Sequence, residues 1–402
     1  MNYTPQEVMQ YIQEEDVKFI RLAFCDCLGH PKNISIMPQE LERAFKYGIS
    51  IDGSAIVGFG DEAQSDLFLH PDPATIMVLP WRPEHGRVVR MFCTVTFPDG
   101  TLFPLDTRSI LKRAIQDAAD AGFTFSFGSE MEFYLFKLDE QGEATKIPYD
   151  QATYMDVSPE DKCENVRREI CLTLEKMGIQ PESSHHEEGP GQNEIDFRYS
   201  DALTAADNAV TFRTVVKTIS ARNGLCADFS PKPLPGAPGS GFHINISVQG
   251  QQPQQMKHML AGILNRIPDI TLFLNPSEQS YRRLGSHKAP KYICWSSNNR
   301  SMLIRIPAAF GEYQRVELRS PDCTANPYLA FALLIWAGLE GLQQQMPLSG
   351  ALNVNLFTAT QHDTSALQAL PGSLPAACRC AAESAFLKAH LPQSLLDYFL
   401  AK

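Results

Sequence analysis

Hydrophobic and polar residues alternate in several segments of the chain, and this period is typical of β-strands that bury one face. The clearest segments are 123–137, 194–199, 241–248 and 316–319. In the first of them, Phe125, Phe127 and Met131 share one face, whereas Glu130 and Glu132 share the other. We therefore predict four strands that each combine a packed face with a charged face.

Helices are predicted where apolar residues recur every three or four positions. The segments are 41–47, 110–122, 165–177, 204–223 and 327–345. Thr107 or Ser109 could cap the helix at 110–122, and Gly122 could end it. The apolar run at 328–339 is too short to span a bilayer and is expected to form a buried helix.

The first hundred residues predict a small α+β unit. A strand, a turn and a second strand fit 17–36, and further strand-like pieces lie at 75–81 and 90–97. The stretch 98–109 is rich in turn residues. We place a domain boundary there, which gives an N-terminal domain at 1–103 and a larger domain at 104–402.

Composition limits the possible partners and compartments. The net charge of −11 argues against nucleic acid and anionic membranes, since both select basic patches. The charged N-terminus lacks the apolar core of a signal peptide. The ten cysteines include two C-x-C pairs, Cys25/Cys27 and Cys378/Cys380, but neither has a partner pair at zinc spacing. We therefore expect reduced thiols and a cytoplasmic protein.

The charged strand faces suggest chemistry. Glu130 and Glu132 would have Cβ atoms ~7 Å apart, so their carboxylates repel unless a cation lies beside them. Similar faces carry Glu194, His243 and Glu317. Taken singly, each has an ordinary interpretation: an exposed acidic face, a structural histidine, an ion-pair ladder.

Together, these faces predict bound divalent cations. Many carboxylates with one imidazole suit Mg²⁺ or Mn²⁺. Arg315 and Arg319 flank Glu317, and metals accompanied by arginines suit phosphoryl transfer. The chain has no G-x-x-x-x-G-K-[ST] motif, so a nucleotide would not bind through a P-loop.

Five ordered motifs resemble those of glutamine synthetase, in its bacterial type I form. They are GSEMEFYLF, SHHEEGPGQNEIDFRYSDALTAADN, PKPLPGAPGSGFHINIS, NRSMLIRIP and RVELRSPDCTANPYLAFALL. The resemblance implies an α+β fold with an N-terminal β-grasp domain and a catalytic domain built on a curved antiparallel sheet flanked by helices. It also implies a homo-oligomer of two stacked hexameric rings, with active sites shared between subunits.

The implied activity is an ATP-dependent ligase that forms glutamine from glutamate and ammonia through γ-glutamyl phosphate. Two Mg²⁺ or Mn²⁺ ions would serve each site. One metal site would use Glu132, Glu187 and Glu194, and the other Glu130, His243 and Glu317. The catalytic residues would be Glu130, Glu132, Arg300 and Asp52, the last supplied by a neighbouring subunit to bind and deprotonate ammonium.

The resemblance also assigns the substrate sites. ATP would bind near Glu182, Tyr199, Asn245, Ser247, Arg300 and Arg305. Glutamate would be held by Gly239, Arg283 and Arg319.

Some positions depart from the family pattern. A histidine is replaced by Asn245, an asparagine by Pro238, and a lysine that contacts ATP by Glu312. Lys288 stands where the loop closing the ammonium site usually has glutamate. These changes leave two alternatives open: a ligase of the same fold that uses an organic amine, and a non-catalytic structural or regulatory family member. For Lys288, the prediction is that it turns to solvent while Asp52 and Asp66 handle ammonium.

Overall fold

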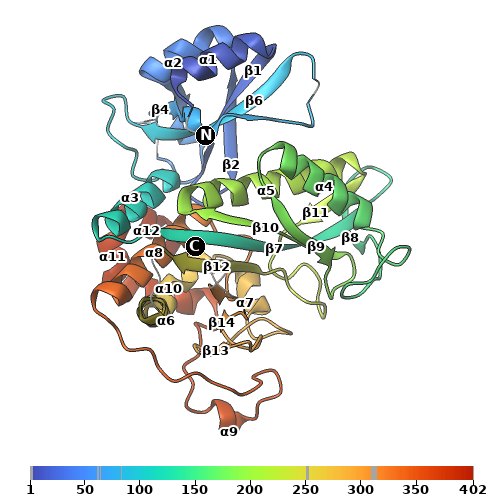
Figure 1. Cartoon of the computed structure of the whole chain (residues 1–402), viewed down its shortest axis with the longest axis vertical. Helices are drawn as coiled ribbons and strands as arrows, with labels where there is room; N and C mark the ends of the chain where they lie inside the picture. Colours follow the sequence, from blue (N-terminus) through green and yellow to red (C-terminus); the bar gives the residue numbers. More distant parts are fainter. Residues whose placement is uncertain are drawn as a thin grey trace.

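The computed structural model describes residues 3–60, 63, 65–82, 84–249, 253–308 and 315–401. A small N-terminal domain lies at the top of Figure 1, and a larger domain built around a long sheet lies below it. Within the described residues, no helix combines the length and apolarity that a membrane-spanning segment needs.

The small domain is a sheet covered by helices. Its strands are β1 (Val17–Cys25), β2 (Pro31–Ile36), β3 (Ile49–Asp52), β4 (Asp66–Pro71), β5 (Met77–Val78) and β6 (Arg87–Thr96), and its helices are α1 (Pro5–Glu14) and α2 (Leu41–Tyr47). The strand order is β2-β1-β6-β4-β3, and β5 pairs with β6. The central β1 and β6 run parallel. The predicted strand–turn–strand and the helix at 41–47 are confirmed, whereas the strand predicted at 75–81 is reduced to β5.

The large domain is organised around β7 (Phe125–Leu138). The other strands are β8 (Ala144–Pro148), β9 (Pro181–His186), β10 (Gln192–Asp201), β11 (Leu225–Asp228), β12 (Phe242–Val248), β13 (Trp295–Ser297), β14 (Ile304–Ile306) and β15 (Val316–Leu318). Their order is β13-β14-β15-β12-β7-β10-β9, with β8 and β11 also pairing with β7. Every pair is antiparallel except β13 with β14. The four predicted strands are therefore neighbours: β15, β12, β7 and β10.

Helices flank this sheet. They are α3 (Thr107–Asp120), α4 (Glu164–Lys176), α5 (Ala202–Arg222), α6 (Pro253–Leu274), α7 (Glu278–Arg283), α8 (Pro327–Gln343), α9 (Gln361–Thr364), α10 (Leu374–Glu383), α11 (Ala385–His390) and α12 (Gln393–Leu400). The apolar face of β7 packs on α8, where the rings of Phe127 and Phe331 stack at 4.3 Å. On α5, Phe212 packs against Phe133 at 6.2 Å. The apolar run at 328–339 lies in the buried α8, as predicted.

One helix prediction needs correction, and one long helix was not predicted. The helix predicted at 110–122 begins at Thr107, because Asp106 is its cap and accepts a hydrogen bond from the backbone of Arg108. The predicted caps, Thr107 and Ser109, are therefore wrong. The pattern analysis also did not identify α6, which contains Pro268.

Buried polar contacts join the two domains. Arg108 donates to Asp207 on α5 at 2.9 and 3.0 Å, and to Asp72 in the small domain at 3.1 Å. Asn326, the cap of α8, donates to the backbone carbonyl of Cys27 at 3.1 Å. Because these groups are buried, separating the domains would leave charged and polar atoms without partners. The small domain is thus held in a fixed position on the large one.

Candidate active site

The charged faces of the central strands meet in three cross-strand rows. The first row contains His185, Glu194 and Glu132. The second contains Asp196, Glu130 and His243. The third contains Arg305, Glu317 and Asn245. Residues directly opposite each other in antiparallel strands have their side chains on the same face, so the pairing register itself brings these groups together.

The rows place acids directly opposite acids. Glu194 faces Glu132, and Asp196 faces Glu130. Burial and the neighbouring charge of Asp196 raise the pKa of Glu194 well above its usual range. Burial and the charge of Glu130 raise the pKa of Asp196 to about 7. The fold therefore brings together carboxyl groups that oppose one another's ionisation.

Glu130 differs from Glu194 and Asp196, because His243 and Asn245 lie beside its carboxylate. Its carboxylate lies 3.4 Å from His243 Nδ1 and accepts a hydrogen bond of 2.8 Å from Asn245. Although burial opposes the change, these donors lower the pKa of Glu130 to about 2. This carboxylate is ionised at neutral pH and can serve as a ligand.

Divalent cations fit this donor set. Among the described residues, Glu130, His243 and Glu317 have ligand atoms within 4.8 Å of one another, which is the second trio implied by the sequence. Glu132, Glu187 and Glu194 do not form a single cluster of that kind. Instead, Glu194 clusters with Glu132 and His243 on one side, and with Glu187 and His185 on the other. Hard carboxylate oxygens at this spacing suit Mg²⁺ or Mn²⁺.

A cavity of about 560 Å³ opens over the rows, and one of its walls is basic. The acids Glu130, Glu132, Glu187 and Glu194 line it, and so do the arginines Arg283, Arg300, Arg305, Arg315 and Arg319. Glu317 is 1% exposed and accepts hydrogen bonds from Arg305 at 2.5 Å and Arg319 at 3.1 Å. Cationic and anionic walls in one cavity can bind a phosphate group between bound cations and guanidinium groups.

A smaller cavity adjoins the first and shares Glu130, Asp196 and Arg315 with it. Its walls include Glu182, Tyr199, Asn245 and Ser247, all of which the sequence assigned to ATP. Asn245 accepts a hydrogen bond of 2.9 Å from Arg315 and donates to Glu130. Its amide thus connects the basic wall with an acid of the second row.

The loop that carries Pro238 and Gly239 lies against the acids. Tyr134 donates to the carbonyl of Pro238 at 2.6 Å, and Gln192 donates to that of Gly239 at 3.1 Å. A Cβ atom at Gly239 would lie 2.4 Å from the carbonyl oxygen of Pro231 and 2.8 Å from the Arg283 side chain. Position 239 therefore requires glycine.

Two residues assigned to the acceptor side lie on the small domain. Asp52 is exposed at the end of β3, where its carboxylate accepts hydrogen bonds from Ser54 at 2.6 and 2.9 Å. Asp66 lies directly opposite Asp52 on β4. Neither residue lines either cavity of this chain. Glu312 lies outside the described residues.

Lys288 lies at the large cavity. Its side chain is 59% exposed and forms an ion pair with Glu188. Its charge is therefore partly neutralised by a residue of the same chain.

Two site residues were missed by the sequence analysis, His185 and Asp196. Asp196 follows Glu194 by two positions in the same strand, so the alternation that identified Glu130 and Glu132 could have identified it. His185 lies on β9, opposite Glu194. Its role depends on strand pairing between distant segments, which the local pattern does not contain.

The chain matches two family models over nearly its whole length. Residues 16–98 match the glutamine synthetase β-grasp domain, and residues 104–402 match the glutamine synthetase catalytic domain. A glutamine synthetase from Methanosarcina mazei is 43% identical, with 99% of this chain and 92% of that protein covered. One from Clostridium saccharobutylicum is 41% identical, with 99% and 94% covered.

Solved structures share the fold. A GmaS/ADP complex superposes with a TM-score of 0.89 at 28% identity, covering 100% of this chain and 94% of the other. A Plasmodium falciparum glutamine synthetase determined by cryo-electron microscopy has a TM-score of 0.87 at 21% identity, with 99% and 95% covered. At that identity the second comparison concerns the fold only.

The raised pKa values predict coupled effects of pH and metal. The folded-state pKa of Glu187 and of Asp196 is about 7, above the ordinary values of 4.5 and 3.8. Burial and a neighbouring acid cause both shifts, because they disfavour the ionised carboxylates. The folded protein is therefore stabilised while these acids are protonated, and it loses that stability as pH rises through about 7. A divalent cation bound among these carboxylates would have to displace such protons, so the affinity for Mn²⁺ should increase between about pH 6 and about pH 8.

Thermal unfolding with and without Mn²⁺ at the two pH values measures this effect. The stabilisation by Mn²⁺ should be larger at the higher pH. Glu187→Gln, which removes one titrating group, should weaken the dependence. Equal stabilisation at both pH values in the wild-type protein would contradict the electrostatic account.

Proposed function

The chain belongs to the glutamine synthetase family, and we propose that it catalyses the ATP-dependent formation of glutamine from glutamate and ammonia. It is an enzyme, a glutamate–ammonia ligase. One observation carries this proposal beyond family membership: the acids of the first two cross-strand rows line one cavity together with five arginines. Phosphoryl transfer to a carboxylate needs this combination, because donor and acceptor are both anions.

Two metal sites are proposed. Glu132, Glu187 and Glu194 would hold one Mg²⁺ or Mn²⁺ ion, and Glu130, His243 and Glu317 the other. When bound, the ions would neutralise the phosphates and orient the phosphoryl group for in-line transfer. His185 lies 3.3 Å from Glu194 and can orient that carboxylate.

The two substrates are proposed to enter from different parts of the cavities. ATP would occupy the smaller one, beside Glu182, Tyr199, Asn245 and Ser247, with its phosphates directed toward Arg300 and Arg305. Glutamate would bind at Gly239, Arg283 and Arg319. Arg283 is held in place by hydrogen bonds to the carbonyls of Ser320 at 2.7 Å and Arg319 at 3.2 Å.

The reaction then has two steps. The side-chain carboxylate of glutamate attacks the γ-phosphorus of ATP, which forms γ-glutamyl phosphate and releases ADP. Ammonia attacks the activated carbonyl, and phosphate leaves. We assign the catalytic roles to Glu130, Glu132, Arg300 and Asp52. Arg300 stabilises charge on the transferring group, and Asp52 of another subunit binds ammonium and takes its proton.

The organisation of the enzyme is part of the proposal. Asp52 lies on the exposed end of β3, apart from the cavities of its own chain, which favours active sites shared between neighbouring subunits. We propose two stacked hexameric rings and a domain boundary at residues 103 and 104. We also place the enzyme in the cytoplasm, since its ten cysteines are free thiols, the state that reducing compartments maintain.

Ammonia is favoured over an organic amine as the acceptor. The relatives named glutamine synthetase are 41% and 43% identical over 99% of the chain, whereas the GmaS structure is 28% identical.

The function predicts ATP-dependent phosphate release that requires both glutamate and ammonium. Glu317→Gln should reduce this rate by at least ~100-fold, because it removes a charged ligand from the second metal site. Glu175→Gln, the same change at an exposed position on α4, is the matched control and should be fully active. Phosphate release that ammonium does not stimulate would contradict the assignment.

Shared active sites predict complementation between two inactive variants. Asp52→Ala and Glu317→Gln subunits are dissociated, mixed in equal amounts and reassembled. If each site combines Asp52 from one subunit with Glu317 from the next, about a quarter of the sites should be intact in a random mixture. A reassembled oligomer without any recovered activity would show that Asp52 serves its own subunit.

Lys288 is predicted to have little influence on ammonium binding. It is largely exposed and already paired with Glu188, so screening should make its repulsion of ammonium small. Lys288→Ala should change the Michaelis constant for ammonium by less than ~3-fold. A decrease of about tenfold, which corresponds to a repulsion near 1.4 kcal/mol, would show that Lys288 points into the acceptor site.

A further inference from the structure

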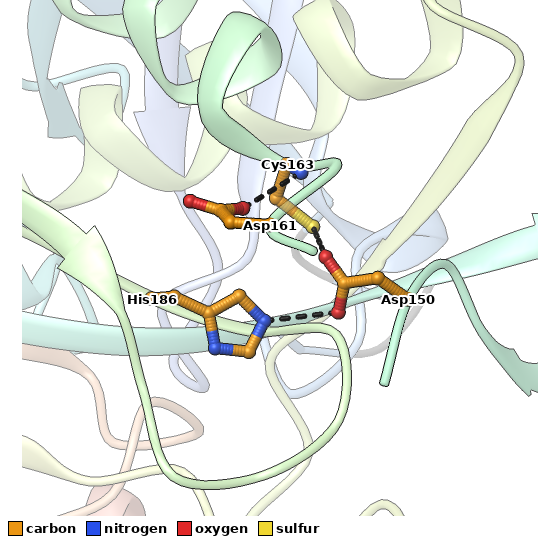
Figure 2. Close-up of side chains that lie close together, drawn as sticks. All are labelled: Asp150, Asp161, Cys163 and His186. Carbon is orange, nitrogen blue, oxygen red and sulfur yellow. Dashed lines mark hydrogen bonds and ion pairs between the residues drawn. The ribbon is translucent and has the colours of Figure 1, made fainter. Parts of the chain in front are cut away.

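A second group of polar side chains lies buried beside the acidic cavity. Figure 2 shows Asp150, Asp161, Cys163 and His186, which are at most 4% exposed. They come from the loop before α4 and from the end of β9. None of these four residues lines the acidic cavity. Their position matters because His186 directly precedes Glu187, at the start of the turn that leads to Glu194.

Asp150 joins the two sides of that turn. Its Oδ1 lies 2.9 Å from His186 Nε2 and accepts a hydrogen bond of 2.9 Å from the backbone of Gly191. The other ring nitrogen of His186 lies 2.6 Å from the carbonyl oxygen of Glu187. Both ring nitrogens therefore face acceptors, and the imidazolium form can donate to both. Through His186, the Asp150 carboxylate fixes the backbone at Glu187.

The other side of the turn is fixed by Asn193, which precedes Glu194 and is fully buried. Its amide donates to the carbonyl of Gly191 at 3.0 Å and accepts from Arg167 at 2.6 Å. Arg167 is held by Asp161 through contacts of 2.5 and 3.2 Å. These contacts restrain the backbone next to Glu194, which follows Asn193.

Gly191 lies between these two restraints and leaves little room for another conformation. Its φ is +69°, a region that favours glycine. A Cβ atom there would lie 2.8 Å from the carbonyl oxygen of Leu135. The turn thus closes against β7 while Asp150 binds its backbone.

The four side chains of Figure 2 are also of types that bind zinc, and their ligand atoms lie within 4.8 Å of one another. Yet the protein already supplies donors to both carboxylates. Asp150 Oδ2 accepts hydrogen bonds from the backbone of Lys162 at 3.0 Å and from Cys163 at 3.2 Å. Asp161 is bound by Arg167 and by the backbone of Cys163. A cation would have to replace these contacts, so the group is a closed hydrogen-bond network.

We propose that Asp150 and His186 are positioning residues of the metal centre, which hold the turn between Glu187 and Glu194 so that both carboxylates enter the cavity correctly placed for a divalent ion. This inference rests on the proposed function, because it assigns those two glutamates to a metal site. Groups that orient metal ligands contribute to affinity although they never touch the ion.

Binding of Mn²⁺ to the intact oligomer, followed by electron paramagnetic resonance without nucleotide, tests the proposal. Asp150→Asn should weaken binding at one site by about 10- to 100-fold, the range found for residues that orient metal ligands. His186→Asn, which is too short to reach Asp150, should have a similar effect. The thermal stabilisation that Mn²⁺ gives should decrease in both variants.

Two control variants separate positioning from general stability. Asp106→Asn removes a buried carboxylate at the cap of α3 and should bind Mn²⁺ like the wild type, even if it unfolds at a lower temperature. Cys163→Ser keeps a donor to Asp150 and should also bind Mn²⁺ normally. Unchanged Mn²⁺ affinity in Asp150→Asn and His186→Asn, together with a lower melting temperature, would reduce the network to a structural role and overturn the proposal.

Three further outcomes would also overturn it. Stoichiometric zinc in the purified wild-type protein that is lost in Cys163→Ser would identify the group as a metal site. A wild-type protein that binds no Mn²⁺ would remove the proposed function together with this inference. Normal Mn²⁺ binding by the wild type and by every variant would remove this inference alone.

Discussion

Mutual repulsion of carboxylates is the constraint on which the structure depends. Antiparallel pairing of β10 with β7 places Glu194 opposite Glu132 and Asp196 opposite Glu130. Like charges in such positions destabilise a sheet, and their burial increases the cost. A fold that keeps this arrangement must obtain compensating interactions elsewhere. Bound cations and the basic wall of the cavity can both provide them, which makes the site a consequence of the strand register.

The register in turn depends on the opposite face of the sheet. Phe127 and Phe133 pack on α8 and α5, so a shift of β7 by one residue would expose these rings and bury the acids against the helices. The apolar side thus holds the charged side in place. Bound cations would only need to neutralise the acids, because the packing has already positioned these side chains.

The sequence predicted the strands well because their signal is local. Alternation identified β7, β10, β12 and β15, and their polar faces carry five of the six proposed metal ligands; the sixth, Glu187, lies in the turn before β10. It did not reveal which strands would be neighbours, so the contribution of His185 from β9 remained hidden. The cap of α3 was misplaced because Thr107 and Ser109 are equally good capping residues in sequence. Asp106 takes that position while its carboxylate also accepts a hydrogen bond from Val95 on β6, a contact between distant segments.

Asn245 shows how a departure from the family pattern is accommodated. The resemblance places a histidine at this position, and an asparagine cannot carry its charge. In this chain the amide donates to Glu130 at 2.8 Å and accepts from Arg315 at 2.9 Å, so it connects an acid of the second row to a guanidinium on the basic wall. An amide can make both contacts at once, since it has a donor and an acceptor on one planar group. A positive charge lies next to this amide on Arg315, which lines both cavities. With asparagine at this position, the cavity still has opposed acidic and basic walls.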